Sequence, residues 1–432
     1  MKAAWIVVDL GFGDAGKGTI TDFLVRDRGA RLVVRFNGGA QAGHNVVTAD
    51  GRHHTFSQIG AGSFVPDVRT LLGPAFLMHP MGMAVEARHL DAVGVPDIWS
   101  RLAVDARARV ISPFHQAANR LRETRRGDQA HGTCGVGVGE CARGDLEHPE
   151  ETISAADLLQ PDILAVRLRM QRQRLAEELP ILDGSPDSDL LHHSSAALID
   201  RIIADWTGLA RQLWVTPPEE SHQLIRDALG VVFEGAQGIL LDEHRGFHPH
   251  TTWSTCTPHG ALAMLAAAHD ARPVTRLGVT RAYMARHGPG PLPTEDPDLK
   301  NQLEEPHNVD GGWQGPFRVG ALDGVLLRYA VTASGGLDGI VVTCLDQIVA
   351  SKAPVCHVYH HPQVTMLPLG VEGDLDHQRR LTRLLQKVRP EICWTDDVIG
   401  FVETATGLPV VLTSHGPTAT DKRWCTLRKA NG

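Results

Sequence analysis

The stretch AAWIVVDLGFGDAGKGTITDFL, residues 3–24, decides the fold of this chain. Its apolar beginning, residues 3–10, is typical of a buried strand, and a helical pattern begins at Thr19. The turn between them carries Asp14, Lys17 and the glycines Gly11, Gly13, Gly16 and Gly18. A strand, a glycine-rich loop with a lysine and a helix together form a phosphate cradle, because backbone N–H groups and a helix N-terminus face the anion. We therefore predict a nucleotide phosphate site at this turn.

The loop fits the pattern G-x-x-x-x-G-K from Gly11 to Lys17, with one departure. Gly18 stands where a Ser or Thr that binds Mg²⁺ is expected. The carboxylate of Asp14 is then the nearby oxygen ligand for a metal, and Mg²⁺ is the predicted cofactor. The alternative is a tight strand-to-helix turn that binds nothing, but a packed turn has no use for Asp14 and Lys17 together.

Composition and charge exclude several classes of function. The 432 residues carry a net charge of −8, which gives no electrostatic case for binding nucleic acid. The seven cysteines are scattered without a C-x-x-C pair, as expected for reduced thiols in a cytoplasm rather than for disulfides or a zinc site. The N-terminus lacks a signal pattern, and no window of about 20 residues is apolar enough to cross a bilayer. We expect a cytoplasmic protein without a membrane partner.

Strands alternate with helices along the chain, and glycine-rich loops follow several of the strands. Strands are predicted at 3–10, 31–36, 231–233, 275–283, 339–345 and 409–413, and helices at 84–93, 114–125, 163–178 and 321–333. The five glycines in 131–144 predict that this segment is not a regular helix. This order predicts an α/β fold whose large central sheet is mostly parallel, with helices on both faces and a ligand site along one strand-end edge. We expect a single domain, 1–432, with excursions around 95–150 and 180–220.

Several loops together resemble the adenylosuccinate synthetase family, GTP-dependent ligases that join IMP to L-aspartate. The segments that carry the resemblance are GFGDAGKGT at 11–19, RFNGGAQAGHN at 35–45, GTCGVGVGE at 132–140, FEGAQGILLD at 233–242, RHGPGPLPTE at 286–295, ALDGVLLRYAV at 321–331, VVTCLD at 341–346 and SHGP at 414–417. They occur in the family's order and span nearly the whole chain. The resemblance implies the family's P-loop-like GTP-binding fold and a homodimer.

The resemblance also implies roles for residues of the reaction centre. Asp14 matches the base that removes the purine N1 proton and is also a metal ligand, and the Gly43 carbonyl matches a second Mg²⁺ ligand. His44 matches the catalytic acid, and Lys17 matches the phosphate lysine. Gln237 matches the side chain that holds the purine edge. A histidine alone in a loop is more often a polar surface group, and a glutamine beside glycines can cap a strand end, but the ordered motifs favour the functional interpretation.

Two nucleotide sites follow from the same resemblance. The GTP site comprises Gly13, Gly16, Lys17, Gly18, Asp346, Ser414, Gly416 and Pro417. Asp346 matches the carboxylate that accepts from guanine, although Cys344 replaces the family's neighbouring lysine. The site of the phosphoryl acceptor comprises Asp14, Gln41, Thr133, Cys134, Arg143, Gln237 and Thr252. Glu140 replaces a proline of the family in this region, where its charge is expected to repel a 5′-phosphate.

The amine site departs most from the family. In that family, the arginines of one loop bind both carboxylates of aspartate. The equivalent stretch of this chain, 311–318, keeps only Arg318 and has Trp313 and Phe317 among its other residues. Arg286 and His287 complete the predicted amine site. Each charge-assisted bond lost is worth about 1.5–3 kcal/mol, so the sequence predicts a donor other than aspartate. The alternative interpretation is a surface loop without a role.

The function predicted from these observations is GTP-dependent phosphorylation of an oxo or amide oxygen, followed by displacement of phosphate by an amine. The acceptor is predicted to be a purine nucleotide or a related heterocycle, and the product contains a new C–N bond. Two alternatives stay open. One is a true adenylosuccinate synthetase with a diverged aspartate loop, and the other is a nucleotide-binding sensor that catalyses nothing.

Overall fold

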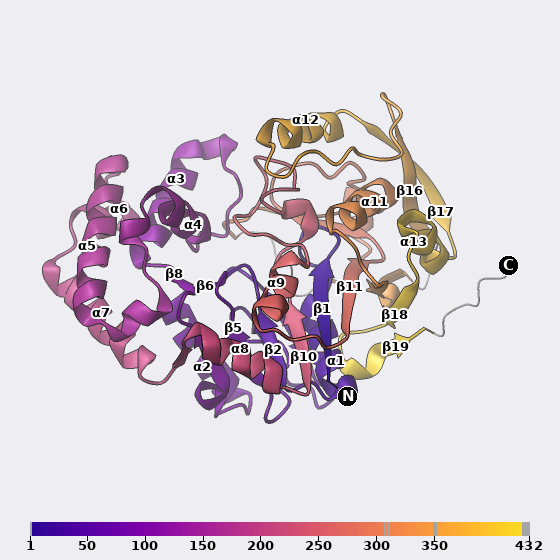
Figure 1. Cartoon of the computed structure of the whole chain (residues 1–432). Helices are drawn as coiled ribbons and strands as arrows, with labels where there is room; N and C mark the ends of the chain where they lie inside the picture. The colour runs from indigo at the N-terminus through magenta and orange to yellow at the C-terminus, as the bar shows by residue number, and fades with distance from the viewer. Residues whose placement is uncertain (1, 306–307, 309–311, 349–351, 426–432) are drawn as a thin grey trace.

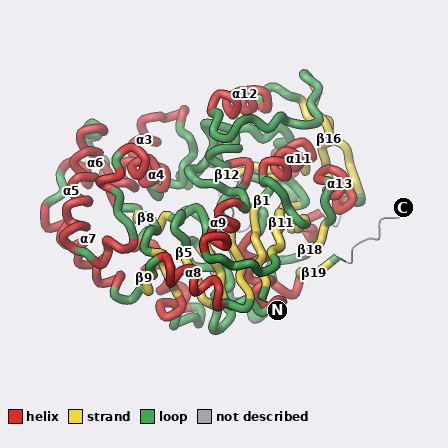
Figure 2. Tube along the Cα trace, in the orientation of Figure 1, coloured by secondary structure: helices red, strands yellow, loops and turns green. Residues whose placement is uncertain are grey.

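The structure is a computed structural model that describes residues 2–305, 308, 312–348 and 352–425. Its strands are β1 Ala3–Asp9, β2 Leu32–Arg35, β3 His44–Val47, β4 His53–Phe56, β5 Arg69–Leu72, β6 Leu77–Met78, β7 Leu102–Asp105, β8 Arg109–Val110, β9 Trp214–Thr216, β10 Gly230–Glu234, β11 Val274–Arg281, β12 Met284–His287, β13 Phe317–Gly320, β14 Leu322–Asp323, β15 Gly339–Thr343, β16 Ala353–His360, β17 Arg389–Thr395, β18 Val410–Ser414 and β19 Lys422–Trp424. Figure 2 separates these strands from the helices and loops by colour.

The helices are α1 Lys17–Arg28, α2 Pro80–Ala92, α3 Pro113–Arg126, α4 Val138–Glu147, α5 Pro161–Glu178, α6 Pro186–His192, α7 Ala196–Ala210, α8 Pro218–Asp227, α9 His259–Ala267, α10 Pro297–Lys300, α11 Gly324–Ala333, α12 Leu375–Leu385 and α13 Val398–Thr406. Helices α3 to α7 gather at one side of the sheet, on the left in Figure 1, and the ranges 95–150 and 180–220 contribute to this group. In the part of the chain that the structure describes, none of the helices combines the length and apolar character needed to cross a membrane.

A ten-stranded sheet runs through the centre of the molecule in the order β19-β18-β15-β11-β1-β10-β2-β5-β7-β9. Every neighbouring pair is parallel except β18 and β19, which are antiparallel. The predicted mostly parallel central sheet is therefore confirmed. Because all these parallel strands end at the same edge, the loops that follow them meet there.

Strand β1 shows why the sequence forms a sheet that is covered on both sides. Ile6 packs in a cluster with residues of α9, α11 and α13, whereas Val7 packs with Leu24 of α1 and Val232 of β10. Both side chains are fully buried although they point to opposite faces. This burial on both faces explains the nearly continuous apolar run of β1, which is typical of parallel sheets.

The prediction that 131–144 is not a regular helix was wrong in its second half, because α4 begins at Val138 and contains two of the glycines. Gly137 precedes the helix in a left-handed conformation (φ 94°), which is strained for a residue with a side chain. A Cβ at Gly137 would lie 2.7 Å from the backbone nitrogen of Gln116 in α3. The glycine therefore lets the start of α4 pack closely on α3, and the remaining residues continue as a helix.

Candidate functional site

Three glycine-rich loops pack against one another at the carboxyl edge of the sheet. A Cβ at Gly238, after β10, would lie 2.1 Å from the carbonyl oxygen of Gly11 in the loop after β1. A Cβ at Gly38, after β2, would lie 2.5 Å from the Cβ of Ala236. The backbones of the segments that carry Asp14, His44 and Gln237 therefore contact one another, as their positions after neighbouring parallel strands require.

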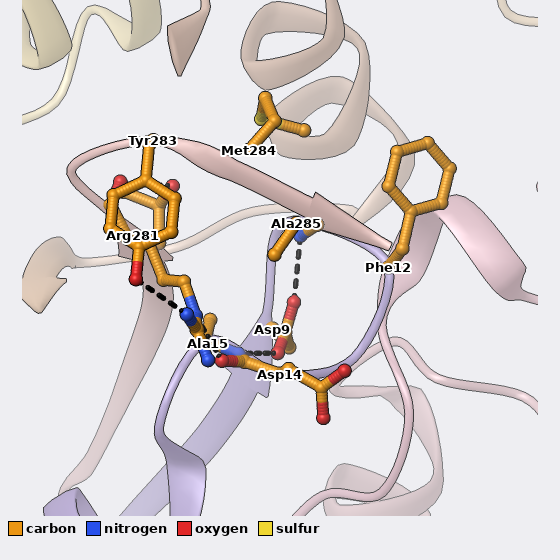
Figure 3. Close-up of a pocket in the computed structure, with 10 residues that line it drawn as sticks. Asp9, Phe12, Asp14, Ala15, Arg281, Tyr283, Met284 and Ala285 are labelled. Atoms are coloured by element: carbon orange, nitrogen blue, oxygen red, sulfur yellow. Dashed lines mark hydrogen bonds between the residues drawn. The ribbon is translucent and has the colours of Figure 1, made fainter. Parts of the chain in front are cut away.

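Asp9, at the end of β1, organises the phosphate loop. Its carboxylate accepts from the backbone N–H groups of Gly11 at 2.7 Å and Ala15 at 2.8 Å. It also pairs with the ammonium of Lys17 at 2.9 Å, and both side chains are buried. Figure 3 shows the Asp9 carboxylate enclosed by the loop, between Ala285 above and Asp14 below, in a hollow lined by residues of the loop and of β11 and β12. Asp9 was not predicted as a site residue, although a carboxylate at the end of an apolar strand was a signal.

The loop glycines and Lys17 have the local conformation of an anion site. Gly13 and Gly16 have positive φ of 123° and 92°, and Gly16 caps the start of α1. The ammonium of Lys17 also donates to the carbonyl of Gly13. An ammonium has three N–H donors. Two of them bond to Asp9 and Gly13, so the third is left for a phosphate oxygen.

Asp14 is held by its backbone, while its carboxylate stays accessible. Its carbonyl accepts from the Nε of Arg281 at 2.5 Å. Its side chain is 30% exposed, and Oδ2 lies 3.6 Å from the Nε2 of His287. Figure 3 shows Arg281 against the loop and the Asp14 carboxylate pointing away from Asp9.

His44 and Glu234 form a buried dyad between β3 and the end of β10. The Nδ1–H of His44 donates to Oε1 of Glu234 at 2.6 Å, and the other carboxylate oxygen accepts from the N–H of Ala61 at 3.0 Å. Burial lowers the pKa of His44, and Glu234 opposes this shift. Burial raises the pKa of Glu234, but the attraction of His44 and Arg35 outweighs it, so the pKa falls. Glu234 belongs to the motif FEGAQGILLD, but no role was predicted for it from the sequence.

The packing of His44 explains why Gly18 replaces the usual Ser or Thr of a phosphate loop. A Cβ at Gly18 would lie 2.6 Å from the Cβ of His44, closer than side chains approach. The first turn of α1 and strand β3 can therefore lie side by side only with glycine at position 18.

We expect the substitution Gly18→Ala to destabilise the protein by about 1–3 kcal/mol, the usual effect of overpacking. Urea unfolding measures this change. Gly208→Ala, in α7, is the matched comparison, because Gly208 also lies within a helix and a Cβ there meets nothing within 4 Å. An equal or smaller loss for Gly18→Ala than for Gly208→Ala would contradict the packing argument.

Two glutamines of the predicted acceptor site carry polar atoms without partners. Gln237 has a left-handed backbone (φ 56°), and its Oε1 is buried without a hydrogen bond among the described residues. In the same part of the chain, both the Oε1 and the Nε2 of Gln41 are buried and unpaired. Unpaired buried amides are costly and call for an explanation, which a bound ligand with donors and acceptors supplies.

Thr133, Thr252, Cys134 and Gly43, which are also predicted to line the reaction site, differ in their hydrogen bonds and burial. The hydroxyl of Thr133 accepts from Asn119 at 2.9 Å, and the N–H of Thr252 donates to the carbonyl of Leu241 at 2.7 Å. Burial raises the pKa of the Cys134 thiol, so this cysteine is a poor nucleophile. Gly43, the predicted carbonyl ligand of Mg²⁺, is exposed directly before β3.

Glu140 and Arg143 neutralise each other in a network of helices α3, α4 and α5. Glu140 pairs with Arg122 at 3.0 Å and with Arg143 at 3.0 Å. Arg143 also reaches Glu178 at 2.9 Å, and this carboxylate has its pKa lowered to about 2 despite partial burial, because Arg143 and Arg174 donate to it. The charge of Glu140 is therefore matched by two guanidinium groups rather than directed alone at a phosphate.

Both arginines of the predicted amine site are engaged by the protein. Arg286 is 2% exposed and donates to the carbonyls of Pro289 and Pro291 at 3.0 and 3.1 Å. Burial, reinforced by Arg318, lowers the pKa of Arg286 to about 9. Arg318 forms a two-point ion pair with Glu295 and also donates to two backbone carbonyls.

The aromatic residues of the amine site divide into one buried and one exposed ring. Phe317 is 1% exposed, and its ring lies 4.9 Å from that of His287. Trp313 is 45% exposed and packs against Gly135, where a Cβ would lie 2.7 Å from the indole. Gly311, the first residue of the predicted loop, lies outside the described residues.

The predicted base pocket gathers at the ends of β15 and β18. Asp346 follows β15 and is exposed, and Cys344 before it has a left-handed backbone (φ 57°). The hydroxyl of Ser414 donates to the carbonyl of Gly416 at 3.1 Å, and Thr19 of α1 donates to the carbonyl of Pro417 at 2.9 Å. The turn after β18 therefore contacts the helix of the phosphate loop, so the predicted phosphate and base sites lie side by side.

This arrangement defines a class of protein: an α/β protein with a phosphate loop and a buried histidine–glutamate pair at the carboxyl edge of its parallel sheet. Comparison with known proteins agrees, because the family model for adenylosuccinate synthetase matches residues 6–422. The adenylosuccinate synthetase of Myxococcus xanthus is 30% identical over 436 residues and covers 95% of this chain and 96% of that protein.

Two solved structures share the fold at low sequence identity. A fully ligated adenylosuccinate synthetase of Plasmodium falciparum is 19% identical, with a TM-score of 0.80 over 98% of this chain and 99% of that one. The succinoaminodeoxyadenylate synthetase (PurZ) of cyanophage S-2L, bound to dGMP and to dATP as energy donor, is 17% identical, with a TM-score of 0.62 over 98% and 95%. The chain belongs to the adenylosuccinate synthetase family of GTP-dependent ligases, as its sequence motifs predicted.

Proposed function

We propose that this ligase phosphorylates the 6-oxygen of a purine nucleotide with GTP and then replaces the phosphate with an amine other than aspartate. In the first step, Asp14 takes the proton from purine N1, and the 6-oxygen attacks the γ-phosphorus as the bond to GDP breaks. In the second step, the amine forms the C–N bond, and the C–O bond breaks with release of phosphate. The chain is proposed to act as a homodimer.

The observation that carries this proposal is the juxtaposition of an accessible carboxylate, a buried histidine dyad and an unpaired amide at one sheet edge. The Nδ1–H of His44 is hydrogen-bonded to Glu234, so Nε2 is the atom of the ring that is left to bond a phosphoryl oxygen. The unpaired Oε1 of Gln237 has the chemistry to hold a donor of the purine. A protein that only bound nucleotides would need neither Asp14 nor the dyad, and this argues against a sensor.

The residues fit a magnesium ion. The Asp14 carboxylate is partly exposed and its contact with His287, at 3.6 Å, is too long for a hydrogen bond, so oxygen lone pairs are left for a cation. Carboxylate and carbonyl oxygens are the ligands that Mg²⁺ prefers, and Asp14 with the Gly43 carbonyl would supply them. The bound ion would neutralise charge that develops on the phosphoryl oxygens.

The proposal of an amine other than aspartate rests on two observations. The family's arginine-rich loop is reduced to Arg318, and the two arginines of the proposed amine site are bonded to other groups of the protein. Arg318 is paired with Glu295, and Arg286 donates to backbone carbonyls. Neither offers an unpaired guanidinium to two spaced carboxylates. A donor with one carboxylate or an aromatic body that meets His287 and Trp313 fits the proposed site better.

A true adenylosuccinate synthetase is the second candidate, because a relative so named is 30% identical over nearly the whole chain. The PurZ neighbour, which was solved with dGMP and dATP, adds deoxyguanylate as an acceptor to test. The deciding experiment measures phosphate release from GTP with IMP, GMP and dGMP, each combined with a panel of amines that includes L-aspartate. Release that needs both an acceptor and an amine supports the ligase, and release with neither contradicts it.

We expect little or no ligation of L-aspartate to IMP. The predicted kcat/KM for aspartate lies at least about 100-fold below the value of about 10⁴ M⁻¹s⁻¹ that is ordinary for enzymes. Steady-state kinetics with IMP, GTP and L-aspartate measure it. A kcat/KM at or above the ordinary value would refute the reassignment and restore the second candidate.

A further inference from the structure

Lys422 is a buried lysine at the base end of the proposed GTP site. It begins β19, where it pairs with Ser414 across the antiparallel strands. Lys422 is 7% exposed, and its Nζ donates to the carbonyl of Gly416 at 2.8 Å. Its ammonium therefore lies beside the turn that carries two of the residues assigned to the base of GTP.

Electrostatic interactions link Lys422 to the loop after β15, on the other side of the proposed base site. Burial lowers the pKa of Lys422 to about 8, while the nearby carboxylates of Asp421, Asp22 and Asp346 oppose that shift. Asp346 and Cys344 both belong to the loop after β15, and β15 is the parallel neighbour of β18. The resemblance places a lysine at the position of Cys344, and Lys422 brings a positive charge to the same end of the neighbouring strands β15 and β18.

We propose that Lys422 reads the 6-position of the purine base of the phosphate donor, while Asp346 reads its N1–H and 2-amino groups. The inference rests on the proposed use of GTP. An ammonium has three N–H donors, and Gly416 takes one, which leaves donors for the 6-oxygen of guanine. Adenine presents an amino donor at that position, which an ammonium repels. Lys422 thereby selects guanine over adenine.

Equilibrium binding of GDP, IDP and ADP to the full chain, measured by calorimetry, tests this selection without requiring turnover. IDP shares the 6-oxygen of GDP and lacks the 2-amino group, whereas ADP lacks both. In Lys422→Met we expect the preference for GDP over ADP, and for IDP over ADP, to fall about 10- to 100-fold, as for loss of a charge-assisted hydrogen bond. The GDP-to-IDP ratio should stay unchanged, and Asp346→Asn should lower it.

Two further variants separate base reading from mere support of the turn. Arg423→Met changes the exposed next residue of β19 and should leave all three ratios unchanged. Cys344→Lys in the Lys422→Met background should restore the preference for guanine. If Lys422 only holds the turn, all three diphosphates weaken together and the ratios stay, which would overturn the inference. Equal binding of GDP and ADP by the unaltered protein would overturn it as well, while leaving the ligase itself to be judged by its turnover assay.

Discussion

Asp14→Asn is expected to abolish turnover and leave the fold intact. The substitution removes the base and the proposed metal ligand in one change, and a positioned acid–base group alone contributes about 10²–10⁴ in rate. The backbone contact from Arg281 to the Asp14 carbonyl is untouched by it, so the loop should keep its conformation. Phosphate release under saturating GTP, acceptor and amine measures the loss.

The matched control is Asp50→Asn, an exposed carboxylate outside the proposed site, which should keep the unaltered rate. Thermal unfolding should place both variants close to the unaltered protein. A loss of less than about tenfold for Asp14→Asn would contradict its assignment as the base, because the neutral amide cannot accept the N1 proton.

His44→Ala is expected to lower kcat by about 10²-fold or more with little change in GTP affinity, since its bond to a phosphoryl oxygen strengthens in the transition state. Glu234→Gln should lower kcat in the same direction, because it removes the charge that holds the Nδ1–H of His44 at 2.6 Å. Steady-state kinetics and calorimetry with GTP separate the two effects.

Because His44 and Glu234 are both buried, removing one partner leaves the other uncompensated and also destabilises the fold. His44→Gln keeps a polar group at the position and serves as the second variant. A His44 variant that loses GTP affinity while kcat is kept would make His44 a binding residue rather than the acid. A folded Glu234→Gln variant with full kcat would remove Glu234 from the mechanism.

The fold could be predicted from sequence because its signals are local. The apolar run of β1 and the glycine loop before α1 are contiguous, and the alternation of strands and helices predicts a parallel sheet. The start of α4 was missed because glycines within a helix look like a loop until Gly137 is seen packed against α3.

The parts of the site that escaped prediction are contacts between residues far apart in the chain. Glu234 meets His44 across 190 residues, and nothing local distinguishes it from a strand-end carboxylate. Arg318 was predicted as a substrate ligand, and its pairing with Glu295, on the loop after β12, has no local signal. Lys422 comes to lie beside the turn after β18 only because β19 folds back antiparallel on β18.

The central claim is that the 6-oxygen of the acceptor leaves as part of phosphate, and following that oxygen tests it most directly. A purine nucleotide labelled with ¹⁸O at position 6 is incubated with the enzyme, GTP, Mg²⁺ and the amine that gives turnover, and the released phosphate is analysed by mass spectrometry. We expect one ¹⁸O in each phosphate and none left in the aminated product. Unlabelled phosphate, the result of hydrolysis of GTP by water, would contradict it.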